Sequence, residues 1–285
     1  RNLRNVMWQS TAIGIVAIGQ TLVILTAGID LSVGGMAAVS AMVGGKVMLE
    51  TNVALGILVT ILVATFSGLV NGAFVAYGKL APFIVTLGVM SICTSLTYVI
   101  SDQASITGLP DSYRFLGRES INLPIRDGGF AIQYYIFVFV GLYLVGHIML
   151  TRTKPGRFIY AIGSNEEAAR LSGVNTRAFK TLAYVISGFL CGVAALILSG
   201  RLGVIDPDNG SGWELQSIAA VVIGGTSLFG GKGSLIGTVI GVFLITILNN
   251  GLNLLRVSSF WQGTAVGAVI ILSVLLERIF RNRGA

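Results

Sequence analysis

Charge is what this sequence has least of. Only 11% of its 285 residues are Asp, Glu, Lys or Arg, whereas charged residues make up about 25% of an ordinary soluble domain. A soluble globule needs such residues to cover its surface. With 54% of the chain hydrophobic, the shortage argues against a soluble fold and indicates that lipid is the main solvent.

Cysteine and histidine are almost missing too. Cys93 and Cys191 both lie inside apolar runs, without the spacing of a disulfide or metal motif, so we expect them to be small buried hydrophobic residues. The one histidine, His147, lies at the edge of an apolar run, which favours an interfacial position over a proton relay. No Ser/His/Asp set, carboxylate pair or metal-ligand cluster occurs, so we expect neither enzymatic chemistry nor a bound cofactor or metal in this chain.

The excess of 19 basic over 12 acidic residues does not indicate nucleic-acid binding. No basic stripe with interleaved aromatic residues occurs. The charges fall in the gaps between apolar runs, where positive residues select the side of a membrane. We therefore expect no nucleic-acid partner.

Apolar runs of about 20 residues, long enough to cross a bilayer as helices, recur along the chain. Six are expected at 6–27, 31–48, 53–77, 81–100, 129–149 and 178–198. A short run at 215–223 and a glycine-rich segment at 224–231 follow, then runs at 235–248 and 262–280. The short run predicts a half-helix whose irregular end is buried in protein or lines a cavity. The predicted fold is an all-α polytopic transmembrane bundle forming a single domain over 1–285.

The basic residues orient this bundle. The connection 150–177 carries five Lys or Arg against two Glu, which predicts a cytoplasmic loop. Counting crossings places the loop 101–128 on the opposite, periplasmic side. That loop has balanced charge and contains Gly108, Pro110 and Pro124, so we expect a turn-rich solvated segment. A docking surface for an external partner is the alternative.

A short helix is expected inside the cytoplasmic loop. Ser164 followed by Glu167 has the spacing of a capping box, and Gly173 suits a helix C-terminus. About eight residues between these signals are too few for a helix that is stable alone in water. The segment either fits a partner's groove as a protruding knob or rests on the membrane surface; its residues are Asn165, Glu166, Glu167, Ala168, Ala169, Arg170, Leu171 and Ser172.

Asp30 is an acidic residue between two apolar runs, with little polar sequence around it. Such a group is costly in a membrane unless it caps a helix, pairs with a cation or lines a polar cavity. We expect it to cap the second run by accepting the amide of Ser32 or Val33. Direct binding of a solute or proton is the alternative.

Further polar residues lie inside the apolar runs and are mostly amides and hydroxyls, the groups that a neutral hydroxylated solute would use. Hydrogen bonds between helices are the alternative role. A nucleotide site is not expected, because a P-loop needs glycine six residues before its lysine and Lys232 has Thr226 there. Candidates for a translocation path or a helix turn are Gln20, Asp30, Ser32, Asn71, Asn249, Asn250 and Asn253.

Five sequence blocks, in order along the chain, resemble the ribose-type sugar permeases of bacterial ATP-binding-cassette (ABC) importers. They are residues 17–24, 28–34, 160–174, 219–228 and 249–255. The resemblance implies a multi-pass protein of the bacterial inner membrane that carries a monosaccharide. Members of that family usually have ten helices, so the resemblance also implies that this chain lacks the first one.

The resemblance further implies a set of partners. These are a second permease copy in a homodimer or related heterodimer, a cytoplasmic ABC ATPase that binds ATP and Mg, and a periplasmic sugar-binding protein. Residues 165–172 would then be the coupling helix that contacts the ATPase. A stand-alone secondary transporter or channel for a small neutral polar solute, with its solute site near Gly224, is the alternative function.

Overall fold

Long apolar runs form most of the helices in a computed structural model of the chain, which describes residues 2–123 and 130–283. Among these residues, seven helices are long and apolar enough to cross a membrane. Each overlaps an expected run, because an apolar run is bounded by polar or turn-forming residues, although α6 begins five residues later and α11 ends six residues later than expected. The seven are α1 (Asn2–Leu25), α2 (Val33–Glu50), α3 (Val53–Ala76), α4 (Pro82–Ser101), α6 (Tyr134–Arg152), α9 (Thr176–Leu202) and α11 (Leu235–Leu254).

The other elements are shorter or less apolar. The short run forms α10 (Trp213–Ile223), an 11-residue helix, and the last run lies in α12 (Ser259–Arg283). The loop expected to be turn-rich instead holds α5 (Asp111–Arg118) and strand β1 (Ser120–Leu123), which pairs antiparallel with β2 (Phe130–Gln133). Its residues 124–128, including Pro124, lie outside the described residues. In the other long connection, α7 (Lys154–Ser164) precedes α8 (Glu166–Leu171).

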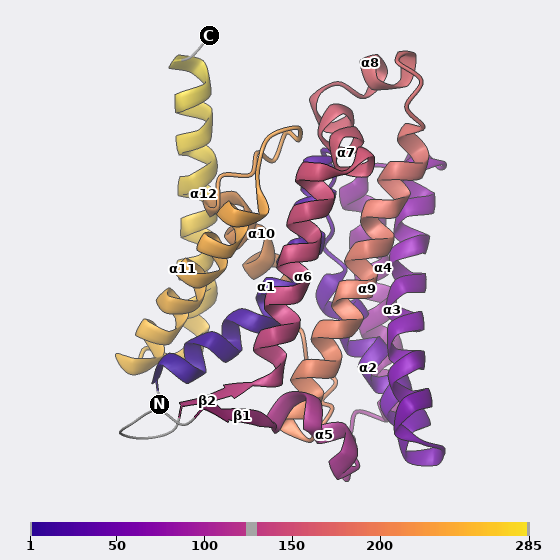
Figure 1. Ribbon diagram of the computed structural model, residues 1–285, viewed down its shortest axis with the longest axis vertical. Coiled ribbons are helices and arrows are strands. Elements are labelled where there is room, and N and C mark those ends of the chain that lie inside the picture. The colour runs from indigo at the N-terminus through magenta and orange to yellow at the C-terminus, as the bar shows by residue number, and fades with distance from the viewer. Residues whose placement is uncertain (1, 124–129, 284–285) are drawn as a thin grey trace.

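These loop elements lie at opposite ends of the bundle. Figure 1 shows α7 and α8 at one end, the same end as the C-terminal end of α12 but across the molecule from it. It shows α5, β1 and β2 at the other, near the beginning of α1. We call these the α8 end and the α5 end. A turn at 224–234 near the α8 end joins α10 to α11, so the half-helix returns within the bundle.

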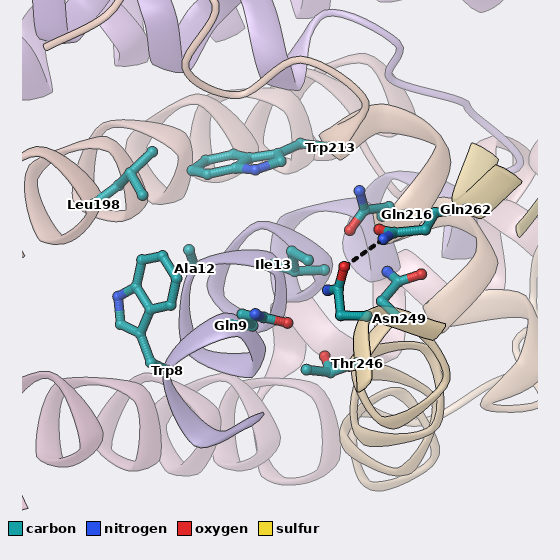
Figure 2. Close-up of a pocket in the computed structure, with 11 residues that line it drawn as sticks. Trp8, Gln9, Ala12, Ile13, Leu198, Trp213, Gln216, Thr246, Asn249 and Gln262 are labelled. Atoms are coloured by element: carbon teal, nitrogen blue, oxygen red, sulfur yellow. Dashed lines mark hydrogen bonds between the residues drawn. The ribbon is translucent and has the colours of Figure 1, made fainter. Parts of the chain in front are cut away.

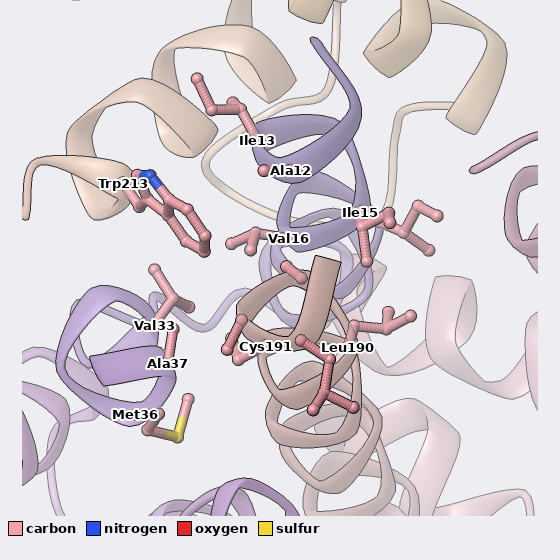
Figure 3. Packing of buried hydrophobic residues seen from close by; sticks show 14 of the residues in the cluster. Ala12, Ile13, Ile15, Val16, Val33, Met36, Ala37, Leu190, Cys191 and Trp213 are labelled. Atoms are coloured by element: carbon pink, nitrogen blue, oxygen red, sulfur yellow. The ribbon is translucent and has the colours of Figure 1, made fainter. Parts of the chain in front are cut away.

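The core is built around α1. In its apolar window 89% of residues are buried, against 22% in α3. Val16 of α1 meets Val33 of α2, Cys191 of α9 and Trp213 of α10 in one cluster (Figure 3). Cys93 and Cys191 are buried and free, as the sequence predicts.

Glycine allows α3 and α9 to approach closely. A Cβ added at Gly68 would lie 2.3 Å from the carbonyl oxygen of Tyr184, and one added at Gly188 would lie 2.3 Å from that of Ala64. Small residues at such contacts are typical of helix pairs packed in lipid. Large apolar side chains instead cover the outer faces of α3, α4 and α6, among them Leu62, Phe66, Ile84, Ile92, Leu144 and Val145.

Candidate functional site

The short helix α8 is present, but its cap and length differ from those predicted. Asn165 is its N-cap residue, and its Oδ1 accepts the amide of Ala168 at 2.9 Å. Ser164 is the last residue of α7. Because Ser164 still belongs to the last turn of α7, the Ser164 hydroxyl does not cap α8. The predicted capping box is therefore wrong. The helix has six residues rather than eight, while Gly173 has the predicted positive φ, +85°.

The two faces of α8 differ. Ala169 is 6% exposed and packs toward the bundle, whereas Leu171 is 74% exposed and Ala168 is exposed too. Small and apolar side chains therefore face away from the chain at the tip of the α8 end. An exposed leucine at a protruding tip is available for contact with another protein, although a single one is ordinary on a protein surface.

One ion pair joins α8 to α9, and a second lies within α8. Glu166 pairs with Lys180 of α9. Arg170 donates from Nε to Oε2 of Glu167 at 3.0 Å and from its terminal nitrogen to Oε1 at 2.5 Å. These hydrogen bonds hold the pKa of the Glu167 carboxyl below its usual range, so the pair stays charged at neutral pH. Only the Glu166–Lys180 pair joins α8 to α9 among these contacts, since Arg170 and Glu167 both belong to α8.

A cleft of about 840 Å³ separates α8 from the turn between α3 and α4. Lys79, Arg177 and Lys180 line it together with Glu166 and Glu167. The Arg177 guanidinium lies 6.0 Å from the centre of the Tyr77 ring. The α8 end thus offers both a protruding helix and a charged recess beside it.

Asp30 lies at the centre of a buried hydrogen-bond network. Its Oδ1 accepts the Ser32 backbone N–H at 3.0 Å and the Ser32 hydroxyl at 2.6 Å. Its Oδ2 accepts the Ser187 hydroxyl of α9 at 3.0 Å. Asn71 of α3 donates to the Ser32 Oγ at 2.7 Å. All four side chains are fully buried.

This network revises the predicted cap. Asp30 accepts the Ser32 amide as expected, but the N-cap position of α2 belongs to Ser32, whose side chain caps no amide. Asp30 lies three residues before Val33, the first residue of α2, and its hydrogen bond to Ser187 joins this segment to α9. Three of the predicted path residues, Asp30, Ser32 and Asn71, are thus brought together by segments far apart in the sequence.

The remaining predicted path residues lie elsewhere. Gln20 is fully buried in α1, and neither polar atom of its side chain has a partner among the described residues. Asn249 and Asn253 line a pocket at the α5 end, whereas Asn250, also buried, is not among the residues that line it.

That pocket also contains side chains that the sequence analysis did not single out. They are Trp8 and Gln9 of α1, Trp213 and Gln216 of α10, and Gln262 of α12 (Figure 2). A possible signal was the presence of tryptophan and amide residues at the ends of several apolar runs. Only the fold shows that these ends meet.

The chain matches known proteins over almost all its length. A family model described as "Branched-chain amino acid transport system / permease component" matches residues 2–274. The chain belongs to this permease family. The family resemblance found in the sequence is confirmed, and the permease is a component of a transport system.

Two relatives of this permease are ribose import permease proteins. The Escherichia coli (strain K12) protein is 39% identical over 278 residues, which cover 97% of this chain and 85% of the relative. The Bacillus subtilis (strain 168) protein is 43% identical over 281 residues, covering 97% and 84%. An inward-facing structure of a metal-chelate type ABC transporter has a TM-score of 0.52 and 16% identity, covering 97% of this chain and 83% of that chain. This last likeness concerns the fold alone.

Proposed function

We propose that this chain is the membrane-spanning permease subunit of an ABC importer that carries a monosaccharide, ribose or a close analogue, across the bacterial inner membrane. The observation that carries the proposal is identity of 39% and 43% with two ribose import permease proteins over nearly the whole chain. Neutral amide and hydroxyl groups inside the bundle agree with an uncharged, hydroxylated cargo.

ATP hydrolysis takes place in a partner subunit under this proposal, and α8 is the coupling helix that touches it. Three observations support this role: the exposed Leu171, the exposed Ala168 and the charged cleft alongside. The α8 end then faces the cytoplasm and the α5 end faces the periplasm, where a sugar-binding protein docks. A second permease copy completes the path.

Two contacts transmit a displacement of α8 to the membrane-spanning helices. The Glu166–Lys180 pair passes it to α9. The end of α7 passes it to α1, because Gly163 lies so close to the carbonyl oxygen of Leu25 that a Cβ there would approach within 1.8 Å. The same carbonyl accepts the amide of Gly231 at 3.0 Å. Movement at α8 thus reaches α1, α9 and the turn before α11 together.

The deciding experiment is uptake by a reconstituted complex. The chain, an ABC ATPase and a sugar-binding protein from the same organism are placed in proteoliposomes, and labelled ribose is followed with and without ATP. We expect uptake only when all three proteins and ATP are present. Uptake by the chain alone, driven by a proton or sodium gradient, would overturn the proposal in favour of a secondary transporter.

A further inference from the structure

A pocket at the α5 end is formed by residues from five helices that are distant in sequence. It lies among the beginning of α1, the end of α9, the beginning of α10, the end of α11 and the beginning of α12. Its volume is about 210 Å³. Pockets for drug-sized ligands are larger, about 300–1,000 Å³. The space therefore suits one small molecule the size of a single sugar ring.

The lining has an unusual composition. It contains two indole rings, from Trp8 and Trp213, and the hydroxyl group of Thr246. None of the eleven described residues that line it is charged. Five side-chain carboxamides complete the polar part, those of Gln9, Gln216, Asn249, Asn253 and Gln262.

This composition matches one class of ligand. A carboxamide offers two N–H donors and a carbonyl acceptor, and a sugar hydroxyl both donates and accepts. An indole offers a broad apolar face with a polar edge, which fits the C–H face of a sugar ring. A charged solute would lack a counter-charge among the eleven lining residues; the Arg201 guanidinium, 3.7 Å from the centre of the Trp8 ring, lies outside the lining and covers one face of that indole. A wholly apolar solute would leave Asn249 Oδ1 without a hydrogen-bond donor.

The polar side of the pocket is partly organised and partly unpaired. Figure 2 shows the amides of Gln216, Asn249 and Gln262 gathered on one side and the two indoles toward the other. Asn253 Oδ1 accepts from Gln262 Nε2 at 2.7 Å. Asn249 is only 8% exposed, yet its Oδ1 has no partner among the described residues. Buried polar atoms in native proteins are usually hydrogen-bonded, so this oxygen is a ready acceptor for a ligand hydroxyl.

We propose that this pocket is a monosaccharide-binding subsite on the permease itself, occupied by the sugar as it leaves the binding protein. The inference rests on the proposed function for its cargo and on the α5 end being periplasmic. The permease then contributes to selection of its cargo, because the uncharged lining favours a neutral sugar over a sugar phosphate, for which the adjoining Arg201 is a cation outside the lining.

Binding is measured first on the purified chain in lipid nanodiscs, by intrinsic tryptophan fluorescence during titration with D-ribose and with ribose 5-phosphate. We expect a saturable change with ribose at lower concentrations than with the phosphate, and tighter binding of the phosphate would overturn the assignment to a neutral sugar. Asn249→Leu and Gln216→Met remove polar groups with little change of volume, and each should raise the apparent Kd for ribose at least fivefold. Gln103→Met alters an exposed glutamine at the same end and should leave it unchanged.

Transport measurements separate this inference from the proposed function. In the reconstituted complex, Asn249→Leu and Gln216→Met should raise the ribose concentration for half-maximal uptake, while ATPase binding and the thermal midpoint stay at wild-type values. If both variants take up ribose as the wild type does and their fluorescence titrations are unchanged, the subsite is overturned. Failure of wild-type uptake would instead overturn the proposed function, and the nanodisc titration would still decide whether the pocket binds a neutral sugar.

Discussion

Asp30 is a fully buried carboxylate, which depends on hydrogen bonds for its stability. Its carboxylate accepts three hydrogen bonds, from Ser32 and Ser187, and no basic side chain of the described residues forms an ion pair with it. The network joins the link between α1 and α2 to α3 and α9. Its loss should therefore loosen three helices at once.

Substitutions at Asp30 separate a structural role from direct handling of solute or protons. Asp30→Ala leaves buried hydroxyls without an acceptor, which should lower the free energy of unfolding by about 2–3 kcal/mol. Asp30→Asn retains one carbonyl oxygen for Ser32 and should cost less than half as much. The measurement is unfolding in detergent titrated with SDS, alongside ribose uptake. A fully stable Asp30→Asn protein without uptake would contradict the structural role and favour the direct one.

Single residues also mark where sequence patterns fail. Ser164 and Glu167 have the spacing of a capping box, yet Asn165 takes the cap because α7 continues through Ser164. A local motif does not reveal whether the preceding residue is already helical. The positive φ of Gly173 was predictable, since glycine just after a helix usually adopts the left-handed conformation that ends it.

Among the elements, α8 offers the sharpest test of coupling. Ala168→Trp adds bulk to its exposed face and should abolish ATPase binding and uptake without moving the thermal midpoint. Ala169→Trp adds the same bulk on the buried face and should destabilise the chain by about 1–3 kcal/mol through overpacking. The readouts are co-purification of the ATPase and thermal unfolding.

An exposed alanine at the opposite end provides the control for α8. Ala104→Trp should leave ATPase binding intact. Retention of the ATPase by Ala168→Trp would refute the assignment of α8 as the coupling helix.

Replacing glycine with alanine should have opposite effects at Gly188, in the contact between α3 and α9, and at Gly141 of α6. A methyl group at Gly188 would lie 2.3 Å from the Ala64 carbonyl oxygen, whereas one at Gly141 of α6 meets no atom within 4 Å. Gly188→Ala should therefore destabilise the chain by about 1–3 kcal/mol. Gly141→Ala should be neutral or stabilising by up to about 1 kcal/mol, because alanine favours helix. Equal thermal midpoints for the two variants would disprove the close packing.

Elements differ in how well the sequence predicts them. The spanning helices were predictable because each is a long apolar run, and α10 because its run is too short to span. In contrast, α5, α7 and β1 lie in charged connections and are only 4 to 11 residues long, so no long apolar run marks them. Strand β2 takes up the beginning of the expected run 129–149, where the sequence predicted helix. The pocket at the α5 end was not predictable, since its lining comes from five helices.

For the whole molecule, orientation is directly testable, because the native cysteines are buried and give little background labelling. Thr107→Cys places a thiol at the α5 end and Ala161→Cys places one at the α8 end, both at exposed positions. A membrane-impermeant maleimide should label Thr107→Cys in intact spheroplasts and Ala161→Cys only after lysis. The reverse pattern would place α8 outside and contradict the proposed function.

The central position of α1 has a consequence for how this protein is made. Its main neighbours, α9 and α11, begin about 150 and 210 residues later in the chain. Until they emerge from the ribosome, a helix whose polar Gln20 and Thr21 become buried in the native bundle has to stand in lipid without its native companions. Slow translation near α9 should therefore prolong the interval in which α1 lacks these neighbours and quality-control proteases can capture the chain.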